Sequence, residues 1–211
     1  RKFVPKGTKI PKSKDWRKEG AVTPVRDQGT SCGSCWAFSV VGATEAQLFR
    51  KNHTLIPLSV QDLIDCDREV DMGCSGGYMD MAFRYIKNYG ITTDADYPYK
   101  EHEGTCHQQG HPIVKITDYE AIDENEDHIV EALATIGPIS AAIKSSTLAL
   151  YSHGILDGQS RCDGRVDHAV LLVGYGEENG IPYYIVKNSW GAQWGEAGYF
   201  RLKRNVGACG V

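Results

Sequence analysis

The chain has 211 residues, of which 41% are hydrophobic and 24% are charged, and its formal net charge is −4. This length fits one large domain or two halves that share an interface. The acidic balance, without a long block of like charges, argues against a protein that binds nucleic acid. The longest apolar runs, such as Ala169–Val173, are far shorter than the roughly 20 residues that a membrane-spanning helix needs.

The first residues and the cysteines indicate the compartment. No signal peptide and no methionine opens the chain, and a start at Arg1-Lys2-Phe3 is typical of the processed product of a longer precursor. Seven cysteines and the sequon Asn52-His53-Thr54, a potential N-glycosylation site at Asn52, favour the secretory route. We therefore expect a lysosomal, vacuolar or secreted protein. The alternative is a cytosolic protein with seven reduced thiols.

Helices are predicted in the first part of the chain, after a basic, extended arm over Arg1–Lys14. Apolar and small residues recur at spacings of three, four and seven over Ser34–Lys51, which predicts a long, largely buried helix. Ser59 is the expected N-cap of a short helix that continues to Cys66. A third helix is expected over Met79–Asn88, before Gly90.

The second part of the chain changes character. One amphipathic helix is expected over Asn125–Ile136, and it is followed by short β-branched runs between glycine-rich turns. Helices followed by strands predict an α+β fold with a ligand cleft between the two halves. The strands are expected at Ile139–Ile143, Ala169–Val173, Tyr183–Lys187 and Gly198–Leu202.

Cys35 is the strongest candidate for chemistry. Six cysteines can pair and one remains, and Cys35 stands in the predicted first turn of the long helix. The helix dipole and unpaired N–H groups favour a negative charge there, so we expect the thiol to ionise more easily than a free thiol, whose pKa is about 8.5.

A cysteine nucleophile needs a base and a group that orients the base. Of the seven histidines, His168 alone directly precedes a buried apolar strand, which would hold its backbone firmly. Asn188 ends another apolar strand, and its amide oxygen could accept a hydrogen bond from the imidazole. Taken alone, Asn188 is better explained as a turn asparagine before glycine.

Several motifs together resemble the papain-like cysteine proteases, in an order that covers Asp15 to Val211. The signature around the nucleophile has histidine and asparagine some 130–150 residues downstream, and here His168 and Asn188 follow Cys35 by 133 and 153 residues. Gly137–Ser140 and Tyr78–Asp80 are most similar to the cathepsin L branch. The motifs are Gln28-Gly29, Cys32–Ser39, Gly73–Gly77, Asp167–Val170, Lys187–Gly191 and Trp194-Gly195.

The resemblance implies a papain-like fold: a mainly helical domain over residues 20–120, a β-barrel-like antiparallel domain over 121–211, and an arm over 1–19 that packs on the second. It implies a cysteine endopeptidase in which Cys35 is the nucleophile and His168 its imidazolium partner. Asn188 would orient His168, Trp190 would shield that hydrogen bond, and the Gln28 amide would form the oxyanion hole with the Cys35 N–H.

The resemblance also implies substrate contacts, disulfides and partners. Peptide and protein substrates, the chain's own propeptide and cystatin-type inhibitors are the expected partners of a monomer. No cofactor and no metal are expected. The apolar pocket would take the second residue before the cut bond. The substrate-binding residues would be Gly76, Gly77, Tyr78, Met79, Ala142, Val166, Asp167, Trp190 and Trp194, and the disulfides Cys32–Cys74, Cys66–Cys106 and Cys162–Cys209.

The sequence departs from the family pattern in two places. Two residues, Thr30 and Ser31, separate Gly29 from Cys32, where relatives mostly have one, and the chain ends at Val211, where relatives usually continue. The extra residue favours the main alternative, a papain-fold protein that binds peptides but cuts them poorly.

Other classes fit less well. A thiol–disulfide oxidoreductase would need a strand before the Cys32–Cys35 motif, but Asp27–Ser31 is turn-like. The GxSxG pattern at Gly73–Gly77 lacks the preceding strand of a serine hydrolase. A zinc site would need a second close Cys/His pair.

Overall fold

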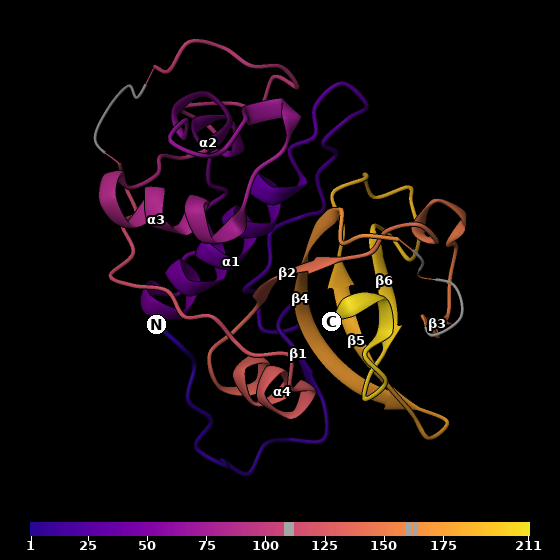
Figure 1. Ribbon diagram of the computed structural model, residues 1–211. Coiled ribbons are helices and arrows are strands. Elements are labelled where there is room, and N and C mark those ends of the chain that lie inside the picture. The colour runs from indigo at the N-terminus through magenta and orange to yellow at the C-terminus, as the bar shows by residue number, and fades with distance from the viewer. Residues whose placement is uncertain (108–111, 159–161, 163) are drawn as a thin grey trace.

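Helices α1, α2 and α3 lie beside the sheet, with α1 against it, while α4 packs on the sheet itself (Figure 1). The computed structural model describes residues 1–107, 112–158, 162 and 164–211. Its α-helices confirm the predicted segments to within one residue or two, and the predicted caps form: Ser59 Oγ accepts a hydrogen bond from the Asp62 N–H at 2.9 Å. The helices are α1 (Cys35–Asn52), α2 (Val60–Cys66), α3 (Met79–Tyr89) and α4 (Glu126–Thr135).

One sheet contains the described strands, in the order β1-β4-β5-β6-β3, and β2 also pairs with β4. The four predicted strands are present. Two further strands of two residues each were not predicted, because two residues are too few to carry an alternating pattern. The strands are β1 (Lys14–Asp15), β2 (Ile139–Ile143), β3 (Ile155–Leu156), β4 (His168–Glu178), β5 (Ile181–Lys187) and β6 (Tyr199–Lys203).

The sheet departs from the expected antiparallel, barrel-like form. Strand β4 pairs with β2 along its first half and with β1 further on, at the same edge, while β5 occupies its other edge. Strand β3 lies at the far end of the order and pairs with β6 in parallel. In the part of the chain that the structure describes, the sheet is therefore open and mixed.

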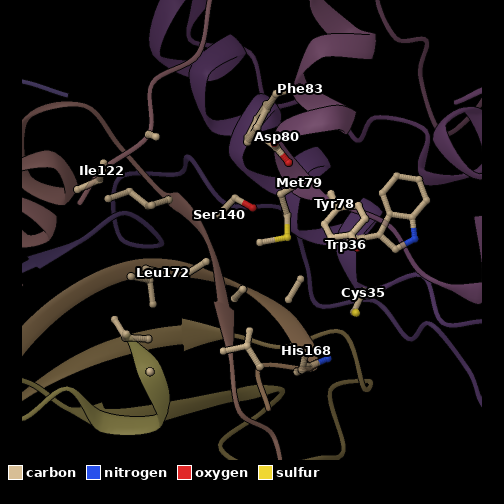
Figure 2. Close-up of a pocket in the computed structure, with 18 of the residues that line it drawn as sticks. Cys35, Trp36, Tyr78, Met79, Asp80, Phe83, Ile122, Ser140, His168 and Leu172 are labelled. Carbon is tan, nitrogen blue, oxygen red and sulfur yellow. The ribbon is translucent and has the colours of Figure 1, made fainter. Parts of the chain in front are cut away.

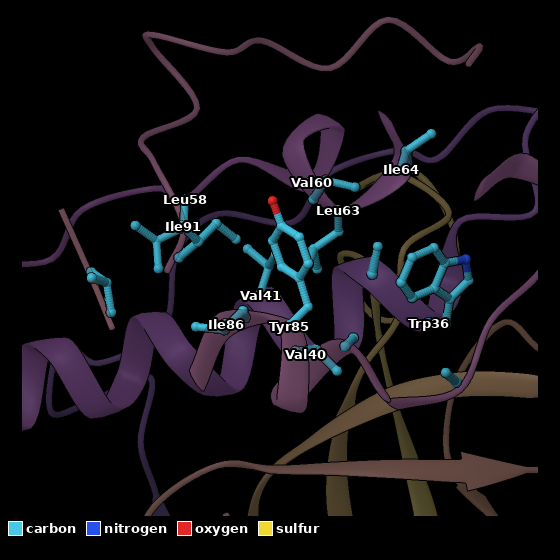
Figure 3. Packing of buried hydrophobic residues seen from close by; sticks show 14 of the residues in the cluster. Trp36, Val40, Val41, Leu58, Val60, Leu63, Ile64, Tyr85, Ile86 and Ile91 are labelled. Atoms are coloured by element: carbon cyan, nitrogen blue, oxygen red, sulfur yellow. The ribbon is translucent and has the colours of Figure 1, made fainter. Parts of the chain in front are cut away.

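Helix α1 is buried along most of its length, because it contacts α2 and α3 on one side and the sheet on the other. Its residues Trp36 and Val40 pack against Leu63 of α2 and Ile86 of α3 in one core cluster (Figure 3). On the sheet side, a Cβ on Gly42 would lie 2.7 Å from the side chain of Leu171, so α1 approaches β4 very closely.

A buried hydroxyl also ties α1 to the sheet. Ser39 donates a hydrogen bond to the Val170 carbonyl of β4 at 2.7 Å, and its oxygen also contacts the Ser140 hydroxyl of β2. These contacts lie one turn after Cys35 and two residues after His168. They fix the start of the helix relative to the start of the strand.

The N-terminal segment runs along α4 and the sheet (Figure 1). The backbone N–H groups of Lys6 and Gly7 donate to the Glu131 carboxylate, and the Trp16 indole donates to the Leu133 carbonyl at 2.8 Å. Strand β1 then pairs with β4. The segment is thus bound through backbone N–H groups, the Trp16 indole and apolar packing of Ile10 and Trp16.

Three disulfides join the pairs that the resemblance implied: Cys32–Cys74, Cys66–Cys106 and Cys162–Cys209. Cys35 is the free cysteine. Asn52, in the sequon, is exposed at the last residue of α1. Within the described ranges, no helix is long and apolar enough to cross a bilayer.

Candidate active site

Cys35 is the first residue of α1, directly after the N-cap residue Ser34, as predicted. The backbone before it is held firmly, because Cys32 is bonded to Cys74 and the Gly33 N–H donates to the Cys74 carbonyl at 2.8 Å. The thiol is half-buried and unpaired. It therefore stands at a fixed point with its sulfur open to a ligand.

His168 is the first residue of β4, with only 7% of its surface exposed. Its Nε2 lies 2.8 Å from Oδ1 of Asn188, the residue that follows β5, and this oxygen also accepts the Ser189 N–H at 2.9 Å. An amide oxygen only accepts, so Nε2 carries the proton and Nδ1 is the atom free for proton exchange. The Trp190 ring packs against the His168 ring, with 4.9 Å between their centres.

Cys35 and His168 line the same end of a cleft of about 770 Å³ (Figure 2). The N–H of Ala169, the residue after His168, is one of the groups that stabilise the Cys35 thiolate. The sulfur therefore lies against the first residues of β4. The fold thus brings together Cys35 and His168, which are 133 positions apart in the sequence.

The electrostatics correct the expectation of a thiol that ionises easily by itself. Burial raises the pKa of Cys35, and it outweighs the N–H groups of Ala169, Trp36 and Cys35 itself, which lower it. Burial also lowers the pKa of His168 against the opposing effects of Asn188 and Asp167. Each group alone thus prefers its neutral form, so either charge depends on a partner of opposite charge.

Gln28 is anchored at several points next to the turn that precedes Cys35. Its amide Nε2 donates to the Cys32 carbonyl at 3.2 Å, and its Oε1 accepts the Ser189 hydroxyl at 2.7 Å. Its backbone N–H donates to the Ser189 carbonyl at 2.8 Å, and its carbonyl accepts the Tyr99 hydroxyl at 2.6 Å. The side-chain amide is therefore oriented by the residue next to Asn188.

The additional residue between Gly29 and Cys32 forms a separately held turn. The Ser31 N–H donates to the Glu101 carboxylate at 3.0 Å, and the Gly29 N–H donates to Asp27 at 2.8 Å. Gly29 has φ +75°, and a Cβ there would lie 1.9 Å from Glu101 Oε1. The loop is thus held by hydrogen bonds of its own, while Gln28 is bound to Cys32 and Ser189. The peptide-binding alternative is not favoured.

The cleft contains most of the predicted substrate contacts. Tyr78 and Met79 come from the start of α3 (Figure 2), and Ala142 lies on β2. Trp190 and Trp194 do not line the cleft; their rings pack edge-to-face, with centres 5.3 Å apart, and Trp190 also contacts His168. The predicted residues that line it are Gly76, Gly77, Tyr78, Met79, Ala142, Val166 and Asp167.

Sequence reasoning missed further lining residues, including Phe83, Ser140 and Leu172. The signal for two of them was available. Phe83 lies four residues after Met79 on the same face of α3, and Ser140 lies two residues before Ala142 on the same face of β2. For Leu172 no such signal existed, because it sits in the part of β4, His168–Gly176, in which every residue is buried.

Residues 10–211 match the model of the papain family cysteine proteases. The chain belongs to this family. Its α+β architecture agrees, since the structure of digestive procathepsin L 3 of the Tenebrio molitor larval midgut superposes with a TM-score of 0.93 at 39% identity, over 100% of this chain and 70% of that one. The papain-like fold expected from the motifs is therefore confirmed.

Two curated family members illustrate the similarity. Probable cysteine protease RD21B of Arabidopsis thaliana is 49% identical over 97% of this chain and 46% of its own length. Cathepsin L of Sarcophaga peregrina is 48% identical over 96% of this chain and 62% of its own. The chain is thus of the cathepsin L-like type and spans about half to three fifths of these relatives.

Replacing Asn188 with alanine tests the orientation of the imidazole. The Nε2–H of His168 would lose its buried acceptor, so the ring would no longer be held with Nδ1 toward the thiol. We expect kcat for a peptide substrate to fall about a hundredfold, the lower end of what positioned proton transfer contributes, with KM nearly unchanged. A variant with full kcat would contradict the role of Asn188.

Proposed function

We propose that this chain is the catalytic part of a cysteine endopeptidase. The single observation that carries the proposal is the position of an unpaired thiol at the first residue of α1 beside the buried His168–Asn188 pair. Membership of the papain family supports the same chemistry.

The first chemical step needs a proton transfer within the pair. Cys35 would give its proton to Nδ1 of His168, which leaves a thiolate beside an imidazolium. Burial penalises either isolated charge, but the two opposite charges stabilise each other at short range. The pair would thus be active over the pH range in which it keeps one proton between its two members.

Peptide cleavage would then proceed through a thioester. The thiolate attacks the substrate carbonyl carbon, and the carbonyl π electrons move to its oxygen. When the tetrahedral intermediate collapses, the C–N bond breaks and His168 protonates the departing amine. A water molecule, deprotonated by His168, then hydrolyses the thioester and releases Cys35 as thiolate.

The negative oxygen of the intermediate would be held by the Gln28 amide and the Cys35 N–H. Gln28 Nε2 donates to the Cys32 carbonyl, and we propose that it turns from there to the substrate. Donors aimed at a developing charge of this kind contribute roughly 3 kcal/mol each.

An extended substrate would bind along the segment Gly76–Tyr78. Gly77 has no side chain, and a Cβ there would lie 2.6 Å from the Trp36 ring, so the backbone edge is the part of this residue that a peptide can reach. Backbone pairing of this kind binds a peptide without regard to its sequence. The adjoining pocket, with Met79, Ala142 and Val166, would then select its side chain.

We further propose how the protein is made and regulated. The curated relatives named above are longer than this chain, and two of the similar solved structures are those of procathepsins. A propeptide that occupies the cleft before cleavage, inhibition by cystatin-type proteins and action as a monomer in a lysosome, a vacuole or outside the cell would fit this family. Glycosylation at the exposed Asn52 would fit the same route.

Hydrolysis of a fluorogenic Phe-Arg dipeptide amide tests the proposed activity. We expect turnover by the parent chain and no detectable turnover by Cys35→Ala, because the nucleophile is absent. A Ser13→Ala variant, altered at an exposed residue far from the cleft, is the control and should keep parental rates. Peptidase activity that survives in Cys35→Ala would contradict the proposal.

A peptide library tests the pocket. The side chains of Met79, Ala142 and Val166 offer no buried charge to a guest, so leucine, valine or phenylalanine should be preferred as the second residue before the cut bond. The profile is measured by sequencing the cleaved products. Preference for arginine at this position would contradict the assignment.

A further inference from the structure

Two buried carboxyl groups lie behind the proposed substrate-binding segment. Asp67 directly follows α2 and is 4% exposed, and Asp71 precedes the turn at Gly73–Ser75 and is 3% exposed. Each is close to a disulfide, Cys66–Cys106 in one case and Cys32–Cys74 in the other. The two groups therefore cannot easily move apart.

Asp71 is bonded directly to the segment that lines the cleft. Its Oδ1 accepts the backbone N–H of Tyr78 at 2.6 Å, and a Cβ built on Gly77 would lie 2.9 Å from the same oxygen. The Met72 N–H donates to the Gly76 carbonyl at 2.9 Å. The carboxyl group of Asp71 thus fixes the backbone of Gly76–Tyr78 from behind.

The second oxygen of each carboxyl group has no conventional donor. Oδ2 of Asp67 and Oδ2 of Asp71 are fully buried, and no N–H group or hydroxyl group in the described part of the chain donates to either oxygen. The two carboxyl groups are hydrogen-bond partners of each other. Two carboxylates have no hydrogen between them, so this contact requires one proton.

The surrounding charges do not replace that proton. The guanidinium of Arg84 is the nearby cation, and it is engaged by Glu69 at 2.8 Å on the surface. The ionisable groups that face the pair from the neighbouring elements are Glu69, Asp80, Arg84 and Tyr85.

We propose that Asp67 and Asp71 share one proton and together act as a positioning pair for the segment Gly76–Tyr78. This inference rests on the proposed function, which makes that segment the substrate edge. In this pair Asp67 is the acid, and it donates to Asp71. Asp71 stays anionic and accepts the Tyr78 N–H.

Asp67 and Asp71 can share a proton only up to mildly alkaline pH. Burial, the hydrogen bond with Asp71 and the negative charges of Asp71 and Glu69 raise the pKa of Asp67 to about 8, against the opposing effect of Arg84. Burial also raises the pKa of Asp71. When the shared proton leaves, two carboxylates face each other without a bond, and the backbone of Gly76–Tyr78 loses its fixed support.

Peptide binding to a Cys35→Ala background tests the inference, because no thiol titrates there. The probe is a fluorescent peptide with leucine as the second residue before the scissile bond, and anisotropy gives its Kd from about pH 5 to pH 9. Between neutral pH and about pH 9 we expect affinity to fall fivefold to tenfold, the effect of losing one anchoring hydrogen bond.

The Asp67→Asn variant on the same background should abolish this fall. Its amide supplies an N–H to Asp71 and does not titrate, while the buried Lys187, whose pKa is lowered to about 8, is retained as in the parent. Asp96→Asn, the same substitution at an exposed residue outside the pair, is the matched control and should keep the fall. A parental pH profile in Asp67→Asn would overturn the proposal.

Stability gives a second readout that does not depend on peptide binding. An aspartate that keeps its proton in the folded state loses folding stability as pH rises from its unfolded value of about 4 toward its folded value. Asp67→Asn should therefore gain stability relative to the parent over that interval. No gain would refute the shared proton, whereas a gain without any peptide binding or hydrolysis would leave the shared proton intact and contradict the proposed function instead.

Discussion

The contact between α1 and β4 is the constraint on which the site depends. Cys35 begins the helix and His168 begins the strand, so their distance is set by how closely the two elements pack. Gly42 against Leu171 permits the close approach, and the Ser39 hydroxyl on the Val170 carbonyl fixes the register. A larger residue at Gly42 would push the two elements apart. The elements are held by buried packing on both sides of α1, which is why a groove open to solvent can keep its reactive groups in place.

Burial then decides the chemistry of the groups that the packing brings together. It favours the neutral thiol in Cys35 and the neutral ring in His168, so neither residue is a strong nucleophile or acid by itself. Reactivity becomes a property of the pair, in which each charge compensates the other. Asp67 and Asp71 follow the same physics with like charges, where burial favours a shared proton instead of an ion pair. In this account, one buried pair performs the reaction and the other supports the substrate edge.

Much of this structure could be predicted from the sequence, and the failures have physical reasons. Helix α1 and the cap at Ser59 were predictable because spacing and caps are local signals. His168 stood out because it directly precedes an apolar strand. The open sheet and the two-residue strands β1 and β3 depend on backbone pairing, which leaves no pattern of apolar and polar residues in the sequence. The predicted direction of the Cys35 pKa shift was wrong. The helix end is a local feature of the sequence, whereas the burial of the thiol depends on β4, which is far away in the sequence. The disulfide pairing and the pocket residues were predicted from the family resemblance. Phe83 and Ser140 could have been added to the pocket from the periods of the helix and the strand on which they lie.

The pH dependence of Cys35 alkylation tests the central claim most directly. The rate of modification by iodoacetamide, with mass mapping of the labelled residue, would be measured in the parent and in His168→Ala. The account predicts a parent thiol that reacts rapidly at mildly acidic pH, because the imidazolium supports the thiolate. In His168→Ala that reactivity should disappear and return only at alkaline pH, since burial raises the pKa of the lone thiol. Identical pH profiles for the two proteins would contradict the account.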